Sequence, residues 1–148
     1  MAQSLSKVYV HITFSTKNRL AFIDNGIDTV LFEYIGGICK GLECNPIKVG
    51  GHIDHVHVLS LLSRKISQMK LLEEIKKQSS KWVKTKDTAY SNFYWQNGYG
   101  IFSVNPSEID TVVNYITNQA THHKKLSFQD EFRAFLKKYK VDYDERYV

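Results

Sequence analysis

The sequence predicts an α+β fold: a ferredoxin-like, RRM-like antiparallel sheet with helices on one face, a C-terminal helix after the last strand, and a short helical tail. Two observations support this prediction. Strand-like and helix-like segments follow one another in the order strand, helix, strand, strand, helix, strand, helix. The chain also has 148 residues, of which 43% are hydrophobic. That length and composition suit one domain, residues 1–148, with a core of its own.

The strand segments are recognised by alternating hydrophobicity. Over residues 7–16 every second residue is apolar, and the residues between include His11 and Thr13. This alternation is typical of a strand with one face in a core. Residues 47–51 and 55–62 form two more such segments around a turn that contains Asp54. Asn97-Gly98, between the aromatic and β-branched segments 94–95 and 99–104, predicts a hairpin.

Four segments have helical spacing of their apolar residues. Residues 28–40 form the first, although Gly36-Gly37 weakens it, and residues 66–84 form the second. A third helix opens after Asn105-Pro106, with Ser107 as the expected N-cap. Ser127 starts the short helix of the tail, which carries several phenylalanines on one side.

Composition and charge exclude several classes of protein. Two cysteines, Cys39 and Cys44, are too few for a disulfide framework and suggest reduced thiols. No apolar run is long enough to span a membrane and no apolar signal region opens the chain, so we expect a cytoplasmic protein. The net charge is +5, and residues 64–86 hold eight basic and two acidic residues, a net +6. A local basic surplus of this kind suggests an anionic partner.

The densest group of functional side chains lies in residues 51–58, Gly-His-Ile-Asp-His-Val-His-Val. On a strand, His55 and His57 point to one face, and the flanking valines point to the other. Two imidazoles side by side can bind one divalent cation, although ordinary hydrogen-bonded histidines would show the same short pattern. Asp54 either contributes a carboxylate or serves the turn, and we favour the turn.

A second group lies on the third helix. Tyr115 and Gln119 are four residues apart and therefore share one face, which we expect to lie opposite the apolar stripe of Ile109, Val112 and Ile116. Taken alone, a helical tyrosine is far more often a packing or surface residue than a nucleophile.

Together the two groups resemble the HUH superfamily of single-strand DNA nucleases. The motifs are His55-Val56-His57 and Tyr115-Ile116-Thr117-Asn118-Gln119, and the chain is most similar to the single-tyrosine transposases of small insertion sequences that move as single-stranded DNA, which are related to the REP-associated tyrosine transposases. The resemblance spans essentially the whole chain. It also includes the Gln78–Trp82 stretch, Trp95-Gln96-Asn97-Gly98-Tyr99-Gly100, His122-His123 and the closing segment from Phe128 to Tyr147.

The resemblance implies a metal-dependent DNA transposase that cuts and rejoins single strands at insertion-sequence ends. His55, His57 and Gln119 would bind Mg²⁺ or Mn²⁺, a ligand set without negative charge. Tyr115, on the C-terminal catalytic helix, would attack the scissile phosphate and form a 5′-phosphotyrosine link. The implied partners are single-stranded DNA with hairpin ends and a second copy of the chain, whose catalytic helix would complete the site in trans.

Several alternatives stay open from the sequence. One is a domesticated relative that nicks repeated palindromes, and another is a non-catalytic nucleic-acid-binding module on the same sheet. A third is a zinc hydrolase that uses His52 with His55 and His57. His11 either neighbours the site or is a simple packed or hydrogen-bonded histidine, and we favour the second interpretation. His122 and His123 are interpreted as solvated or phosphate-facing.

The basic residues suggest where the DNA backbone would run. A stripe of lysines follows one side of the second helix: Lys70, Lys77, Lys81 and Lys84. This stripe would suit a phosphate backbone, and a merely solvated helix face would look the same. The aromatic residues Tyr94, Trp95 and Tyr99 fit either base stacking or packing.

Overall fold

A four-stranded antiparallel sheet forms the centre of the computed structural model, which describes residues 2–122 and 125–148. The strands lie side by side in the order β2-β3-β1-β4, as the α+β prediction requires. The strands and helices are, in chain order, β1 Tyr9–Ser15, η1 Lys17–Arg19, α1 Asp28–Gly41, β2 Pro46–His52, β3 His55–Leu61, α2 Gln68–Lys84, η2 Thr88–Tyr90, β4 Gly100–Val104, η3 Pro106–Glu108, α3 Ile109–Thr117, α4 Gln119–His122, α5 Phe128–Lys138 and η4 Glu145–Tyr147.

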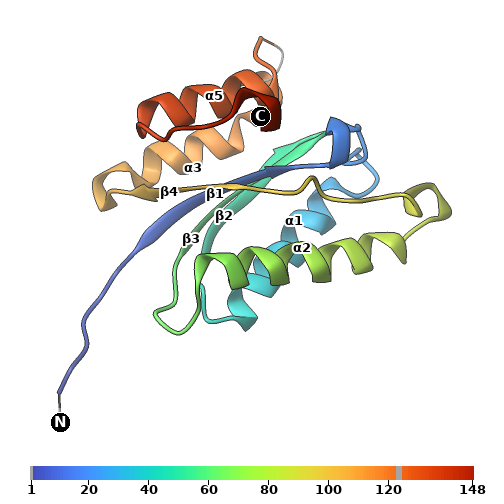
Figure 1. The fold of residues 1–148 in the computed structure, drawn as a ribbon. Coiled ribbons are helices and arrows are strands. Elements are labelled where there is room, and N and C mark those ends of the chain that lie inside the picture. The colour runs from blue at the N-terminus through green and yellow to red at the C-terminus, as the bar shows by residue number, and fades with distance from the viewer. Residues whose placement is uncertain (1, 123–124) are drawn as a thin grey trace.

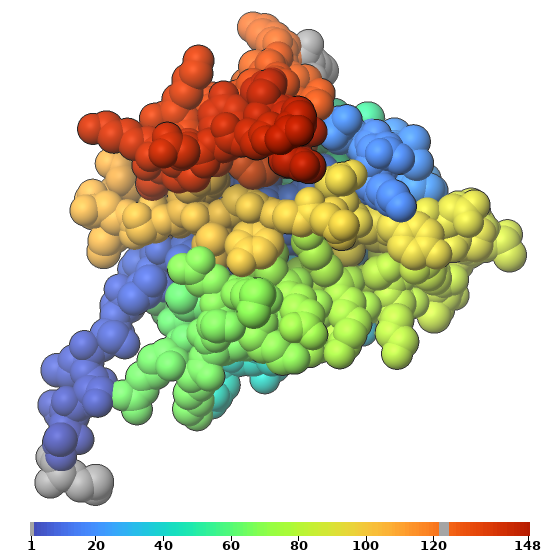
Figure 2. Space-filling view, in the orientation of Figure 1, coloured from blue at the N-terminus to red at the C-terminus, as the bar shows by residue number. Residues whose placement is uncertain are grey.

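Helices cover both faces of the sheet (Figure 1). The helices α1 and α2 lie on one face, and α3 and α5 lie on the other. The space-filling view shows α5 and the C-terminal segment, in red, laid over this second face (Figure 2). The C-terminal helix and the helical tail, which the sequence predicted after the last strand, thus cover the second face of the sheet.

The alternation in the strands decides what each face contains. Val56 and Val58 of β3 join Ile12 and Phe14 of β1 in the main core, under α1 and α2. The residues between them face α3 and α5, where a smaller apolar cluster contains Leu59, Val104 and Ile116. The sheet therefore separates a large apolar core from a second layer that includes polar side chains.

The first helix is more regular than the sequence predicted, and the third helix is less regular. The expected helix 28–40 is continuous from Asp28 to Gly41 despite its two glycines. The third helix is broken, because Asn118 at φ −97° and ψ 22° separates α3 from α4. Its entrance is capped by Asn105, whose side chain accepts a hydrogen bond from the Ser107 backbone N–H, and not by Ser107 itself. Ser127 caps α5 as predicted.

The predicted hairpin at Asn97-Gly98 is wrong. Both of its segments run along the same edge of β1: Trp95 bridges Thr16, the Gln96 N–H donates to the Ser15 carbonyl at 2.9 Å, and β4 pairs with β1 further on. Gly98, with φ of 89°, sits in the interruption between them. Asn-Gly therefore makes a local loop within one edge, where the left-handed conformation requires glycine.

Lys76 of α2 fastens this loop to the helix layer. Its ammonium donates to the Gln96 carbonyl at 2.8 Å and to the Gly98 carbonyl, and it lies 5.5 Å from the centre of the Phe14 ring. Burial lowers the pKa of Lys76 from 10.5 to about 8. The loop at 96–98 is thus held in place by a partly buried cation.

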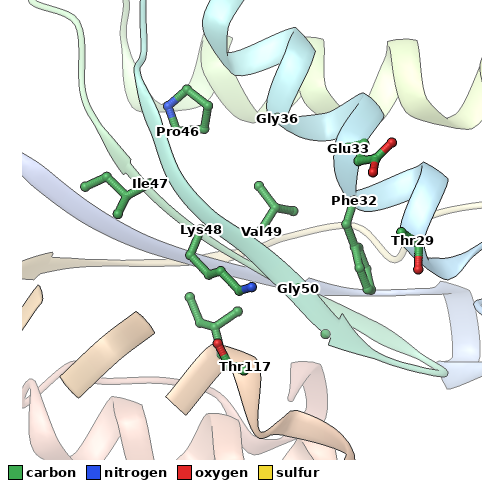
Figure 3. Close-up of a pocket in the computed structure, with 12 residues that line it drawn as sticks. Thr29, Phe32, Glu33, Gly36, Pro46, Ile47, Lys48, Val49, Gly50 and Thr117 are labelled. Carbon is green, nitrogen blue, oxygen red and sulfur yellow. The ribbon is translucent and has the colours of Figure 1, made fainter. Parts of the chain in front are cut away.

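Close packing at Gly50 sets the height of α3 over the sheet. A Cβ atom on Gly50 would lie 2.8 Å from Ile116 Cγ2 and 3.3 Å from the Ile116 carbonyl oxygen. Figure 3 shows Gly50 on β2 with Thr117 of α3 across the strand, in a pocket of about 530 Å³ between α1 and β2. This pocket includes none of the predicted site residues, but Gly50 in its wall determines how near Tyr115 comes to the sheet.

In the described part of the chain, no helix combines the length and the apolar character that crossing a membrane requires.

Replacing Gly50 by alanine is expected to destabilise the fold. The added methyl group must displace Ile116, and overpacking of this kind costs about 1–3 kcal/mol of unfolding free energy. Urea unfolding followed by circular dichroism measures the change. Gly37→Ala is the matched control, since a Cβ there meets nothing within 4 Å and alanine favours the helix. Equal midpoints for Gly50→Ala and wild type would contradict this account of α3.

The buried lysine predicts an alkaline pH dependence of stability. The unfolded chain keeps the Lys76 proton up to about pH 10.5, whereas the folded chain loses it near about 8, so the unfolded state binds more protons between these values. The stability of wild type relative to Lys76→Met should therefore rise as pH increases from 8 to 10.5. Urea unfolding across this range tests the slope, and a flat difference would show that Lys76 titrates normally.

Candidate nucleic-acid processing site

His55 and His57 of β3 are fully buried, with 0% of each side chain exposed, on the sheet face that α3 and α5 cover. Their ring centres lie 5.1 Å apart, as expected for alternate residues of one strand. Buried imidazoles require partners for both ring nitrogens. Those partners define the site.

His55 is held between a carboxylate and an amide. Its Nδ1 lies 2.7 Å from Asp54 Oδ1, and its Nε2 lies 2.9 Å from Gln119 Oε1. Gln119 Nε2 donates to the Tyr115 carbonyl at 3.2 Å, which turns Oε1 toward the histidine. When Nδ1–H donates to Asp54, the Nε2 lone pair of neutral His55 faces the Gln119 oxygen. Two electron-pair donors that converge in this way suit a cation between them.

His57 is held by a histidine and a glutamate. Its Nδ1 lies 2.8 Å from His11 Nε2, and its Nε2 lies 2.8 Å from Glu131 Oε1. Burial, reinforced by His57, lowers the pKa of His11 from 6.5 to about 3, so His11 is neutral at physiological pH. His11 is therefore a hydrogen-bonded histidine that also neighbours the site, the alternative that the sequence interpretation did not favour, and it orients His57.

Tyr115 of α3 points toward the histidines. Its hydroxyl donates to Glu131 Oε2, and its ring centre lies 5.6 Å from that of His57 and 5.8 Å from that of Phe135. The prediction that Tyr115 lies opposite the apolar stripe is wrong, because the half-buried ring packs with Ile116 against the sheet. Burial and the negative charge of Glu131 raise the pKa of Tyr115 well above its usual range.

Glu131 is the site residue that the sequence interpretation missed. It lies on α5, is 1% exposed, and bridges His57 and Tyr115 with its two carboxylate oxygens. One sequence signal could have revealed it. The residue falls on the apolar face of the tail helix, in line with Phe128 and Phe135, where an unpaired carboxylate would be costly.

The arrangement offers a set of metal ligands. One donor atom from each of His55, His57 and Glu131 lies within 4.8 Å of the other two, and Gln119 Oε1 adjoins His55. The expected ligand set carried no negative charge, and Glu131 changes that. His52 pairs with His55 across the β2-β3 turn at 6.4 Å between ring centres, but the third member of the group among the described residues is Glu131.

The remaining predicted residues are Asp54, the lysine stripe and His123. Asp54 lies in the turn between β2 and β3, where its carbonyl accepts from the Thr16 N–H at 2.8 Å and its carboxylate contacts His55. The lysine stripe belongs to α2, on the opposite face of the sheet (Figure 1), where Lys70 and Lys77 pair with Glu74. The structure does not bring these lysines to the histidine pair. His123 lies outside the described residues.

A small hollow of about 200 Å³ opens beside the tyrosine. Tyr115 and Glu131 are among its lining residues, and neither histidine is. The helix α5 covers the histidines instead. Its Phe128 ring stacks on His55, with 4.7 Å between the ring centres. The hollow therefore borders the half-buried Tyr115 ring and not the histidines.

The structure thus combines a ferredoxin-like sheet with a histidine-bearing strand that lies under a tyrosine-bearing helix. A family model described as "Transposase IS200 like" matches residues 4–119, and the chain belongs to this family. No curated protein sequence matches the chain significantly.

Two solved structures share the fold. A candidate transposase from Deinococcus radiodurans R1 is 17% identical with a TM-score of 0.62, and the match covers 80% of this chain and 98% of the other. A REP-associated tyrosine transposase bound to a REP hairpin is 18% identical with a TM-score of 0.61, and this match covers 83% of this chain and 73% of the other. At these identities the likeness concerns the fold.

Proposed function

We propose that this protein is a single-tyrosine DNA transposase that cuts and rejoins single-stranded DNA at insertion-sequence ends. The observation that carries the proposal is the shared carboxylate: Glu131 accepts the hydrogen bond of the Tyr115 hydroxyl and also contacts His57 Nε2. One carboxylate thus contacts both Tyr115, the potential nucleophile, and His57, a potential metal ligand. Membership of the IS200-like transposase family supports this reading.

The bond changes follow from the residues. Tyr115 Oη forms a bond to the scissile phosphorus, and the bond from phosphorus to the 3′ oxygen breaks. The products are a 5′-phosphotyrosine and a strand that ends in a 3′-OH. Because one phosphodiester-type bond replaces another, a second 3′-OH can reverse the step and join a new strand. Glu131, which accepts the hydrogen bond of the Tyr115 hydroxyl, is positioned to receive the tyrosine proton, and the departing 3′ oxygen takes up a proton from solvent to become the 3′-OH.

A divalent cation, Mg²⁺ or Mn²⁺, would be held by His55, His57, Gln119 and Glu131. The fit rests on the donor chemistry: two imidazole nitrogens, an amide oxygen and a carboxylate oxygen converge in a buried volume. When bound, such a cation polarises the phosphoryl oxygens as a Lewis acid. Asp54 and His11 would act behind the ligands by fixing the orientation of His55 and His57.

Substrate access requires a movement of α5. Both histidines are 0% exposed, and Gln119 and Glu131 are 1% exposed. A DNA phosphate therefore reaches these groups only when the Phe128 ring, at the start of α5, moves off His55. In this movement Glu131, further along α5, keeps its contacts to Tyr115 and His57.

The substrate and the assembly state are also part of the proposal. The solved relative bound to a REP hairpin supports single strands with folded hairpin ends as the DNA substrate. A domesticated endonuclease acting on repeated palindromes is the second candidate, favoured by the same relative. A homodimer is expected for the family. One chain here already brings Tyr115 to its own His57, so a dimer would not need to complete the site in trans.

A non-catalytic nucleic-acid-binding module is less well supported. Such a module would use the open face of its sheet. In this chain, the face that carries His11, His55 and His57 is covered by α3 and α5.

Tyr115→Phe is expected to abolish a covalent protein–DNA adduct. The phenyl ring keeps the packing against Phe135 but has no oxygen to attack phosphorus. The protein is incubated with Mn²⁺ and labelled single-stranded hairpins that carry randomised flanks, and adducts are counted on a denaturing gel. Tyr34→Phe is the matched control, since Tyr34 stacks on Trp82 in the opposite layer. An adduct that persists in Tyr115→Phe would remove Tyr115 as the nucleophile.

A further inference from the structure

A third cavity is lined in part by Phe128, the ring that stacks on His55. Its volume is about 650 Å³, and its walls come from the η1 turn, the loop at 96–99, and α5 with the C-terminal segment. These three segments, in blue, yellow and red, meet on the face shown in Figure 2. Phe128 lines this cavity and stacks on His55 with the ring planes at 29°, so one aromatic ring separates the cavity from the proposed metal ligands.

We propose that this cavity binds an unpaired nucleotide of the DNA strand next to the scissile phosphate. The inference rests on the proposed function and adds a substrate-binding site to it. The chemistry of the walls matches the base and the phosphate of a nucleotide: an aromatic surface for the face of the base, amide groups for the edge of the base, and a cation for the phosphate.

The aromatic part is Tyr99, with Phe132 and Phe128 behind it. Tyr99 is 36% exposed at the cavity although it is a large ring, and Gly98 before it leaves open space. Unpaired bases stack on such rings with little regard to sequence.

The amide part is Gln96. Its Oε1 accepts a hydrogen bond from the Asn18 N–H at 3.0 Å, which fixes the side-chain amide and leaves the NH₂ group as a donor. Asn97 lies beside it in the same wall. Amides of this kind hydrogen-bond to the edges of unstacked bases.

The cationic part is Arg19. It is half-buried at the cavity, and among the described residues no carboxylate forms an ion pair with it. The Arg146 guanidinium in the same cavity is instead neutralised by Asp144. A guanidinium without a counter-charge suits a phosphate, which it contacts through two N–H groups at once.

The backbone of the site is held rigidly before any ligand binds. Asn18 and Arg19 have φ values of 56° and 55°, a left-handed conformation that side-chain-bearing residues rarely adopt and that often marks functional sites. On the opposite wall, Lys76 binds the carbonyls of Gln96 and Gly98. A site organised in this way loses little entropy when a nucleotide binds.

Photocrosslinking tests the proposal without relying on cleavage. Twelve-nucleotide single strands (a length of about one OB-fold site) carry 5-iododeoxyuridine and are irradiated with the protein in EDTA, and the linked peptide is identified by mass spectrometry. We expect the crosslink on Tyr99. Arg19→Ala should lower the yield about tenfold, whereas Lys40→Ala, an exposed lysine at the end of α1, should leave it unchanged.

The outcomes separate this inference from the proposed function. Crosslinks confined to α2, or an unchanged yield in an Arg19→Ala protein with wild-type thermal stability, would overturn the nucleotide site. If Arg19→Ala unfolds, Tyr99→Leu replaces it: crosslinking is expected to disappear, and transfer of the crosslink to another segment at full yield would overturn the site. A protein that crosslinks at Tyr99 but forms no tyrosine adduct would keep the site and lose the proposed function.

Discussion

Two imidazoles buried on one strand are the constraint on which the second layer of this protein depends. Because β3 alternates, burying Val56 and Val58 under α1 and α2 forces His55 and His57 to the opposite face. Once α5 covers that face, each ring nitrogen needs a partner within the protein. Four elements besides β3 itself contribute to the layer around the histidines: β1, the β2-β3 turn, the α3-α4 junction and α5.

The positions of the site residues also depend on how α3 packs against the sheet. Tyr115 and Ile116 are neighbours, and Ile116 rests on Gly50, where a Cβ atom would meet it at 2.8 Å. The position of the Tyr115 phenol thus depends on packing at Gly50 of β2, a residue that has no functional side chain. The helix breaks at Asn118, and after the break the Gln119 side chain lies against His55. The sequence had predicted one continuous helix with Tyr115 on its polar face, which needs no such break.

Much of this arrangement could be predicted from the sequence, and the parts that could not have physical reasons. The alternating hydrophobicity was sufficient to predict the strands of the sheet and to predict that His55 and His57 point to the same face. The motif Tyr-x-x-x-Gln predicted that Tyr115 and Gln119 lie close together, and Gln119 does bond to the Tyr115 carbonyl, but the break at Asn118 places it at the start of α4 and not on the helix of Tyr115. Glu131 was missed because its partners are 74 and 16 residues away, and only the docking of α5 brings them together. The Asn97-Gly98 hairpin failed because pairing with β1 overrides local turn preference.

Anomalous X-ray diffraction from crystals of the protein soaked with Mn²⁺ shows whether the His55, His57, Gln119 and Glu131 side chains converge on a divalent cation. We expect one anomalous peak bonded to His55 Nε2 and His57 Nε2, with Glu131 or Gln119 as a further ligand. A saturated crystal in which Mn²⁺ binds elsewhere, while His55 Nε2 stays on Gln119 and His57 Nε2 stays on Glu131, would contradict this expectation.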